Sequence, residues 1–511
     1  MRLSGESLAR IDRSSELYKK LATVHQRIAV KDPSTWGPDA ADEAAIRLNW
    51  VDLPEASRTL LVEIDALTAR FRQIKTIVLA GMGGSSLAPE VIAGSYGREL
   101  FILDSTDPNY LAHVINGDLA TTLVVVSSKS GSTIETASAR AVFAAAFVAA
   151  GLALNEHMVV VTDPGSPLDL DARERGLSVI NADPNVGGRF SALSAFGLVP
   201  SALAGVDISL LLDAASDCKE SFLSDPSIVF DVAWLLTTQT EQYLAFIDAN
   251  SGLPGLSDWI EQLVAESTGK SGVGRLPIVV ESVDGASIGG AFTVAFSECA
   301  ADLIVQGELG EHFIFWEWVT ALVGAALEID PFNQPNVTEA KNATSTLLKE
   351  WGGALPLFTA ESVDGTVEIF GKGGSLHEAL AQFCSGVAED GYISIHAYLD
   401  RRDDVALVEL RRILSEKTGR PVTFGWGPRF LHSTGQFHKG GQQNGSFLQI
   451  TGDTTSDFGI PGSGFSFATL LMAQALGDSR ALGQRKFPLL RLHLQDRSAG
   501  ISHILKAARS L

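Results

Sequence analysis

Short apolar runs alternate with longer segments of helical periodicity between about residues 70 and 180. The runs show no polar alternation, which is typical of strands buried on both faces of a parallel sheet. The expected strands are 76–80, 100–103, 123–126, 158–162 and 178–180, and the helical patterns between them are 89–95, 134–151 and 167–176. This order predicts an α/β domain with a doubly wound parallel sheet over residues 56–215.

A second alternating series follows a long helical region at 207–250. Its expected strands are 278–281, 392–399, 422–424, 447–450 and 489–494, and its helical patterns are 289–305, 313–328, 337–349, 374–387 and 403–416. We therefore divide the chain into a helical N-terminal segment (1–55), a first α/β domain (56–215), a helical connection (216–250) and a second α/β domain (251–511). No low-complexity linker separates the domains, so they should pack together.

Composition narrows the possible partners. The chain has 511 residues, 45% of them hydrophobic and 19% charged, and its net charge of −21 argues against nucleic acid or an anionic membrane. An anionic substrate must then be bound by local positive groups. Cys218, Cys299 and Cys384 form no C-x-x-C pair, which is typical of reduced thiols in the cytoplasm. No secretory signal and no apolar run of about 18 residues is present, so we expect a cytoplasmic protein.

The segment 127–136, SSKSGSTIET, joins an expected strand to an expected helix. Its hydroxyl groups, its one lysine and the free N–H groups of a helix N-terminus together suit a phosphate. Ordinary helix capping by Ser and Thr is the alternative. No Walker A sequence is present, which favours a phosphorylated metabolite over a nucleotide. Glu135 and Arg140 are expected on the solvent side of the following helix.

A glycine loop, Gly83-Gly84-Ser85, follows the first expected strand and allows a ligand to approach the backbone. It lacks the third glycine of the dinucleotide fingerprint. Further along, Gly187-Gly188 precede Arg189, whose guanidinium suits a phosphate or an oxyanion. A surface arginine that caps a helix is the alternative.

Three further loops carry ionisable groups. Glu266 lies in AESTGK, where a carboxylate among small residues can act as a base, although a helix-capping role is the alternative. Lys341 follows the two prolines of DPFNQPNVTEAK, and a solvated lysine is the alternative. His432 and His438 lie in the glycine-rich segment 430–445, where histidine can move protons near neutrality, and solvated histidines are the alternative. The absence of a nearby carboxylate or cysteine at ligand spacing disfavours a metal there.

The blocks SSKSGSTIET, GGRFSALSAFGLVPSALAG, ESTGK and PFNQPNVTEAK occur in that order. Together they resemble the phosphoglucose isomerase family, which is built from two sugar-isomerase (SIS) domains. HSTGQFHKGG most resembles the isomerase half of transaldolase–phosphoglucose isomerase fusion proteins. The resemblance covers about residues 25–500 and implies two SIS-type αβα domains. The chain starts where the isomerase half would start, so we expect no transaldolase domain.

The resemblance also implies roles for matched residues. The phosphate loop falls on Ser128, Lys129, Ser130 and Thr133, and the substrate-binding loops fall on Gly83, Gly84, Ser85 and Gly188. Arg189 would stabilise an enediolate, Glu266 would be the base, and Lys341 with a histidine would open the sugar ring. The lysine block here precedes the histidine motif, unlike the usual family order, and Asn333 replaces an aspartate. We favour His432 over His312 and His438 because its local motif, HSTGQ, matches.

The implied reaction is aldose–ketose interconversion of glucose 6-phosphate and fructose 6-phosphate through a cis-enediol, a step of glycolysis and gluconeogenesis. No metal or redox cofactor is expected, and the resemblance suggests a homodimer or one chain acting alone. Two alternatives stay open: isomerisation of another sugar phosphate such as mannose 6-phosphate, and a non-catalytic SIS-type sugar-phosphate sensor. An amino-sugar synthase would need a cysteine after the initiator methionine, where this chain has Arg2.

Overall fold

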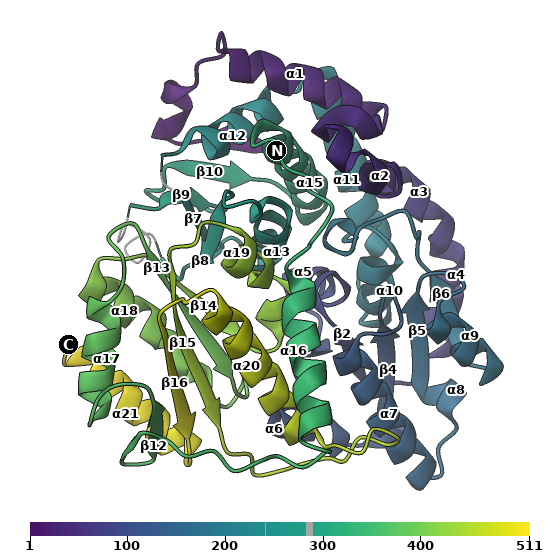
Figure 1. Cartoon of the computed structure of the whole chain (residues 1–511). Coiled ribbons are helices and arrows are strands. Elements are labelled where there is room, and N and C mark those ends of the chain that lie inside the picture. Colours follow the sequence, from purple (N-terminus) through teal and green to yellow (C-terminus); the bar gives the residue numbers. More distant parts are fainter. Residues whose placement is uncertain (241, 283–289) are drawn as a thin grey trace.

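The computed structural model describes residues 1–240, 242–282 and 290–511, whose strands form three sheets (Figure 1). The first sheet has the order β3-β2-β4-β5-β6 and is parallel throughout. Its strands are β2 (Thr76–Gly81), β3 (Phe101–Leu103), β4 (Thr122–Ser127), β5 (Met158–Thr162) and β6 (Ser178–Asn181). All five expected strands of the first α/β domain are confirmed.

Alternate residues of this sheet face two different cores. Leu79, Leu123 and Val125 pack on the side of α4 (Leu61–Arg70), α5 (Leu87–Ser95) and α10 (Ala195–Leu203). Val78 and Val124 pack on the other side, against α6 (Pro108–Ile115), α7 (Ile134–Ala149) and α9 (Pro167–Glu174). Both faces are therefore covered by helices, which explains the uninterrupted apolar runs. The doubly wound α/β prediction is confirmed.

The strands outside the first α/β domain form two further sheets. One sheet, β1-β10-β9-β7-β8, contains β1 (Arg2–Ser4), β7 (Tyr243–Ile247), β8 (Leu276–Val279), β9 (Phe292–Ala295) and β10 (Leu303–Gln306). The other, β11-β12-β16-β15-β13-β14, contains β11 (Ser362–Asp364), β12 (Val367–Phe370), β13 (Tyr392–Tyr398), β14 (Val422–Trp426), β15 (Gly445–Gly452) and β16 (Leu489–Leu494). We had expected one α/β domain over 251–511, with β7 inside a helical connection. The two sheets share a core at Tyr392 and Phe447, so they pack together.

Helices account for most of the remaining chain. The longer ones are α1 (Glu16–Ala29), α11 (Ile208–Ser224), α12 (Ser227–Thr238), α13 (Leu256–Thr268), α15 (Leu309–Ala326), α16 (Val337–Glu350), α17 (Leu376–Ser385), α18 (Glu409–Thr418), α20 (Phe467–Gln484) and α21 (Arg497–Arg509). The short ones are α2 (Ala41–Ala45), α3 (Leu53–Ala56), α8 (Leu154–His157) and α19 (Gly435–Gly440). Among the described residues, no helix is both long and apolar enough to cross a membrane.

The helix expected at 289–305 is wrong where the structure describes it. Residues 290–305 carry β9 and most of β10, and residue 289 lies outside the described residues. β9 pairs in parallel with β7, and β10 pairs with β9 and, antiparallel, with β1. Pairing with strands from distant parts of the chain therefore outweighs the local helical pattern.

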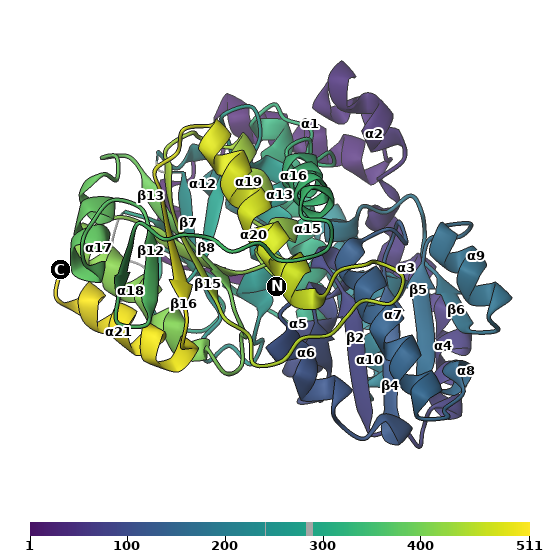
Figure 2. The same cartoon turned by 60° about the horizontal axis from the view of Figure 1, so that its bottom comes forward.

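Helices α16 and α20 run side by side between the third sheet and the first α/β domain (Figures 1 and 2). Leu347 of α16 and Leu470 and Ala473 of α20 join the same core as β4 and α7. Segments more than 200 residues apart in sequence are thus held against the N-terminus of α7 by apolar packing.

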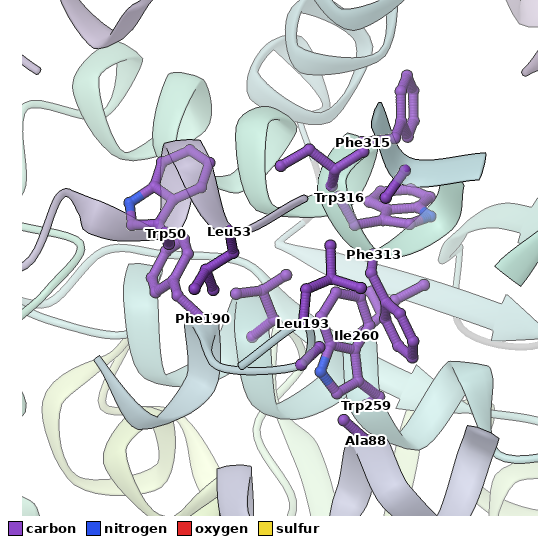
Figure 3. Close-up of a cluster of buried hydrophobic side chains, with 14 of the residues drawn as sticks. Trp50, Leu53, Ala88, Phe190, Leu193, Trp259, Ile260, Phe313, Phe315 and Trp316 are labelled. Atoms are coloured by element: carbon purple, nitrogen blue, oxygen red, sulfur yellow. The ribbon is translucent and has the colours of Figure 1, made fainter. Parts of the chain in front are cut away.

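An aromatic core lies beneath the helix that carries Glu266 (Figure 3). Trp259 and Ile260 of α13 and Phe190, next to Arg189, are buried among residues of α15 such as Phe313. The Trp259 and Phe313 rings meet edge to face with centroids 4.8 Å apart. This packing fixes the backbone at both Glu266 and Arg189.

Candidate active site

A pocket of about 210 Å³ opens at the N-terminus of α7. Its lining comes from the loop after β4, from α16 and α20, and from η10 (Arg429–His432). The β4 loop contributes Ser130, Ser132 and Thr133, and the other elements contribute Lys341, His432 and Gln474. The pocket lies at the carboxyl end of β4, where ligands of doubly wound sheets bind.

The serine-rich loop keeps the start of α7 available to an anion. Thr133 is the N-cap residue of α7, and no side-chain cap hydrogen bond is made there. Ser128 shapes the loop instead, since its Oγ accepts from the Gly131 N–H (3.2 Å) and donates to Thr133 Oγ1 (3.3 Å). Ser130 and Ser132 hydrogen-bond to each other at 2.9 Å along the pocket. Uncapped N–H groups and hydroxyls at a helix N-terminus suit a phosphate.

Lys129 does not reach this pocket. Its Nζ donates to Asp163 Oδ2 at 2.6 Å and to the Pro184 carbonyl at 3.0 Å. The structure therefore does not bring together all four residues assigned to the phosphate loop. The flexible side chain of Lys129 instead pairs with the carboxylate of Asp163, which directly follows the neighbouring strand β5.

Lys341 is the cation that the pocket offers. It lies on α16, is exposed, and makes no hydrogen bond or ion pair with the rest of the described chain. His432 lines the same pocket and is hydrogen-bonded to Glu135, with 3.1 Å between His432 Nε2 and Glu135 Oε1. A free ammonium and an oriented imidazole are thus both presented to a ligand in the pocket.

Glu135 is buried, contrary to the expectation that it marks the solvent side of α7. Burial by itself would raise the pKa of its carboxyl, but His432 and Lys341 outweigh burial and hold that pKa below its ordinary value. Glu135 therefore stays ionised and can orient the His432 ring. The sequence pattern missed it because η10 and α20, which cover it, come more than 290 residues later.

Glu266 and Arg189 form a second group next to the pocket. Glu266 lies in the last turn of α13, and the Arg189 Nη1 group donates to its Oε2 at 3.2 Å. Burial raises the pKa of Glu266, although Arg189 and His432 oppose this change. A buried carboxyl with a raised pKa is well suited to accept a proton from carbon near neutral pH.

The Arg189 guanidinium is fully bonded. Its donors reach five acceptors, namely Ser267 Oγ, Glu266 Oε2, Gln334 Oε1 and the carbonyl oxygens of Pro331 and Asn333. Burial lowers its pKa, but an arginine remains charged in proteins. Arg189 thereby joins the GGR, ESTGK and PFNQP segments into one unit and places a fixed positive charge beside Glu266.

Gln262 connects the two groups. Its Nε2 donates to the His432 carbonyl at 2.8 Å and lies 3.5 Å from Glu266 Oε2. A Cβ at Gly83 would meet the same Nε2 at 2.7 Å, so the glycine loop also borders this point. Gln262 was not singled out from the sequence, because it lies one helical turn before Glu266 in an ordinary helical pattern.

Gly84 and Gly188 meet backbone to backbone. A Cβ on Gly84 would lie 1.9 Å from the Gly188 carbonyl oxygen, and Ser191 Oγ lies 3.4 Å from the Gly84 carbonyl oxygen. Ser85 continues this turn and is buried. The glycine loop therefore holds the GGR segment in place.

Replacing Gly84 by alanine should destabilise the protein by about 3 kcal/mol, because the added methyl group overlaps a backbone oxygen that cannot move alone. Urea unfolding measures this change. Gly151→Ala is the control, because a Cβ there meets nothing within 4 Å and only the cost of its positive φ of 72° remains. Equal losses for the two variants would contradict the close-packing argument.

The other two candidate histidines are in different surroundings. His312 is fully buried in α15, neither ring nitrogen has a hydrogen-bond partner in the described chain, and burial lowers its pKa to about 3. His438 is buried between Tyr392 Oη (3.0 Å) and Ser394 Oγ (3.2 Å). Neither lines the pocket, whereas His432 does. Of these three histidines the structure places His432 at the pocket, and its role in ring opening stays a prediction.

Comparison with known proteins gives the same family. The model of the family described as phosphoglucose isomerase matches residues 58–307. A glucose-6-phosphate isomerase of Geobacter sulfurreducens is 30% identical over 373 residues, which are 67% of this chain and 69% of that protein. Another, of Citrifermentans bemidjiense, is 33% identical over 277 residues, so the chain spans about half (51%) of its length.

A solved structure supports the fold. The crystal structure of a glucose-6-phosphate isomerase from Chlamydia trachomatis matches with a TM-score of 0.53 at 22% identity, covering 67% of this chain and 85% of that one. The matched family region includes the glycine loop, the phosphate loop, Arg189 and Glu266. The chain belongs to the phosphoglucose isomerase family.

Proposed function

We propose that this chain interconverts glucose 6-phosphate and fructose 6-phosphate. One observation carries the proposal: a buried carboxylate, Glu266, contacts the fixed cation Arg189 beside a pocket edged by His432 and Lys341. An aldose–ketose isomerisation needs one base that removes a proton and returns it, and groups that open the ring. The family relationship supports the same reaction.

The substrate phosphate would bind at the N-terminus of α7. Ser130, Ser132 and Thr133 offer hydroxyl groups there, and the helix dipole favours a dianion. The sugar then extends toward His432 and Lys341. Ring opening requires one proton to leave the anomeric hydroxyl and one proton to reach the ring oxygen, and these two side chains are the candidates.

Glu266 would carry out the hydrogen transfer. It takes the proton from carbon 2 of the open aldose, and the electrons of that C–H bond form the C1–C2 double bond of the enediolate. The π electrons of the carbonyl move onto O1 and give it a negative charge. The positive charge of Arg189 stabilises this negative charge. The proton of O2 then passes to O1, which moves the negative charge to O2. The O2 electrons form the carbonyl at carbon 2, and the C1–C2 π electrons take up the proton that Glu266 returns to carbon 1, which gives the ketose. Because the Arg189 donors are already occupied, its contribution is that of a preorganised charge.

The function is tested by supplying glucose 6-phosphate and following the formation of fructose 6-phosphate with a coupled enzyme assay that gives a colour change. We expect turnover of glucose 6-phosphate. Turnover of mannose 6-phosphate alone would replace this assignment by the other isomerase, and tight binding of sugar phosphates without turnover would indicate the sensor. Assembly as a homodimer in the cytoplasm stays a prediction.

Replacing Lys341 by methionine should lower kcat/KM for glucose 6-phosphate about 100-fold, because the pocket loses its free ammonium. Lys349→Met is the control, since Lys349 is an exposed residue near the other end of the same helix. A Lys341→Met enzyme with the kinetic constants of the Lys349→Met enzyme would remove Lys341 from the mechanism.

A further inference from the structure

Gln474 forms a buried hydrogen-bonded link behind the His432–Glu135 pair. Its Nε2 donates to Glu135 Oε1 at 2.7 Å, the same oxygen that lies 3.1 Å from His432 Nε2. Its Oε1 accepts from the Thr106 hydroxyl at 2.6 Å. Gln474 is only 2% exposed and Thr106 is fully buried.

The orientation of this amide follows from its neighbours. An ionised carboxylate can only accept hydrogen bonds, so the NH₂ end of Gln474 must face Glu135. The amide oxygen must then face Thr106, which can donate its hydroxyl proton. Each of the three hydrogen bonds that join Thr106, Gln474, Glu135 and His432 therefore has a defined donor and acceptor.

We propose that Gln474 is a positioning residue, which holds the Glu135 carboxylate ionised and aimed at His432. This inference rests on the proposed function, in which His432 takes part in ring opening. In the described part of the chain, the titratable groups that face Glu135 are His432, Lys341 and Tyr398, and Gln474 adds a neutral donor from α20. A donor to a carboxylate stabilises its charged form and removes its freedom to rotate away.

The link also gives the C-terminal part of the chain a role in the reaction. Thr106 follows β3 and Glu135 begins α7, both in the first α/β domain, whereas Gln474 lies on α20. α20 is held in place by its packing against α16, which carries Lys341 (Figure 2). A shift of α20 would therefore disturb Gln474 and the pocket together.

Three variants test the proposal in the full-length enzyme. Gln474→Leu keeps a similar shape but removes the donor, and we expect kcat to fall about 10-fold with KM changed less than about 3-fold. Thr106→Val should lower kcat less, by about 3-fold. The double variant should have the kcat of Gln474→Leu alone, because both substitutions break the same hydrogen-bonded link. Gln484→Leu is the matched control, since Gln484 is exposed at the end of the same helix.

Gln474→Glu gives a readout that lost packing would not produce. A glutamic acid there can donate to Glu135 only while the pair retains a proton, because two adjacent carboxylates resist ionising together. The activity of this variant relative to wild type should therefore be highest at low pH and fall as the pH rises. Wild-type kcat in Gln474→Leu, or a constant ratio for Gln474→Glu across pH, would overturn the proposal.

A spectroscopic measurement tests the positioning role of Gln474 independently of the proposed function. The ¹⁵N chemical shift of the His432 ring, identified by its loss in a His432→Asn variant, reports the hydrogen bond to Glu135. We expect Gln474→Leu to move this shift and Gln484→Leu to leave it in place. If wild type turns over no sugar phosphate, the proposed function fails, and the positioning role is then decided by this shift alone.

Discussion

Replacing Glu266 by glutamine is expected to lower kcat at least 1,000-fold, within the range of about 10²–10⁴-fold that general acid–base groups supply. Glutamine preserves the shape of the side chain but cannot accept the carbon-bound proton. The affinity for fructose 6-phosphate, measured by calorimetry, should change by less than about 3-fold, because the phosphate site at α7 is untouched.

Glu261→Gln is the matched control on the same helix. Glu261 is also buried, and burial raises its pKa well above the ordinary value, which favours the neutral form that glutamine resembles. Its partner, Ser433 Oγ, can still donate to the amide oxygen. Near-normal turnover by Glu266→Gln would sink the assignment of the base, whereas equal losses in both variants would point to damage of α13.

The pH dependence of the wild-type enzyme follows from the same group. Burial raises the pKa of Glu266 above its ordinary value near 4.5, and the base must be unprotonated to work. Activity should therefore fall as the pH decreases through this raised pKa, and the acid limb of kcat/KM should lie above the ordinary value. An acid limb at or below an ordinary glutamate pKa would contradict this environment.

Replacing Arg189 by lysine should lower kcat about 100-fold and destabilise the protein by about 2 kcal/mol. Lysine keeps the charge but offers at most three donors in place of the five hydrogen bonds that Arg189 makes. At least two of these five acceptors therefore lose their partner, and the charge is no longer held beside Glu266. Steady-state kinetics and urea unfolding measure the two effects separately.

Arg173→Lys provides the comparison for this variant, because Arg173 is half-exposed on α9 and forms an ion pair with Asp169. We expect it to change stability by less than about 0.5 kcal/mol. If Arg189→Lys kept wild-type kcat, then the fixed guanidinium would not stabilise the transition state. If only its stability were lost, Arg189 would be a connector of the three segments.

The parts of the fold that could be read from the chain are those decided locally. β2 and β4 each contain an uninterrupted apolar run, residues 77–80 and 123–126, which is typical of a strand covered on both faces. β9 and β10 were missed because the local pattern at 289–305 is helical, and they exist as strands through pairing with β7 and β1. Pairing partners that lie far away in the chain leave no local periodicity.

The candidate site divides in the same way. Arg189, Glu266, Lys341 and His432 could be selected because small-residue loops and motif order mark them, and the structure brings all four to one region. Lys129 could not be placed, since a long flexible side chain takes whichever carboxylate the fold provides, here Asp163. The sequence pattern predicted an exposed Glu135, because the pattern of its own helix carries no information about η10 and α20, which cover it.

The sequence by itself determined which groups are candidates for the chemistry: a helix N-terminus rich in hydroxyls, a glutamate, an arginine, a lysine and a histidine. Only the tertiary structure decided which charges are free and which are paired. Lys341 is free, Lys129 is bound to Asp163, and Glu135 holds His432. The reason is physical: residue types set which bonds a side chain can form, whereas burial and distance, which arise when distant segments pack, select the bonds it makes.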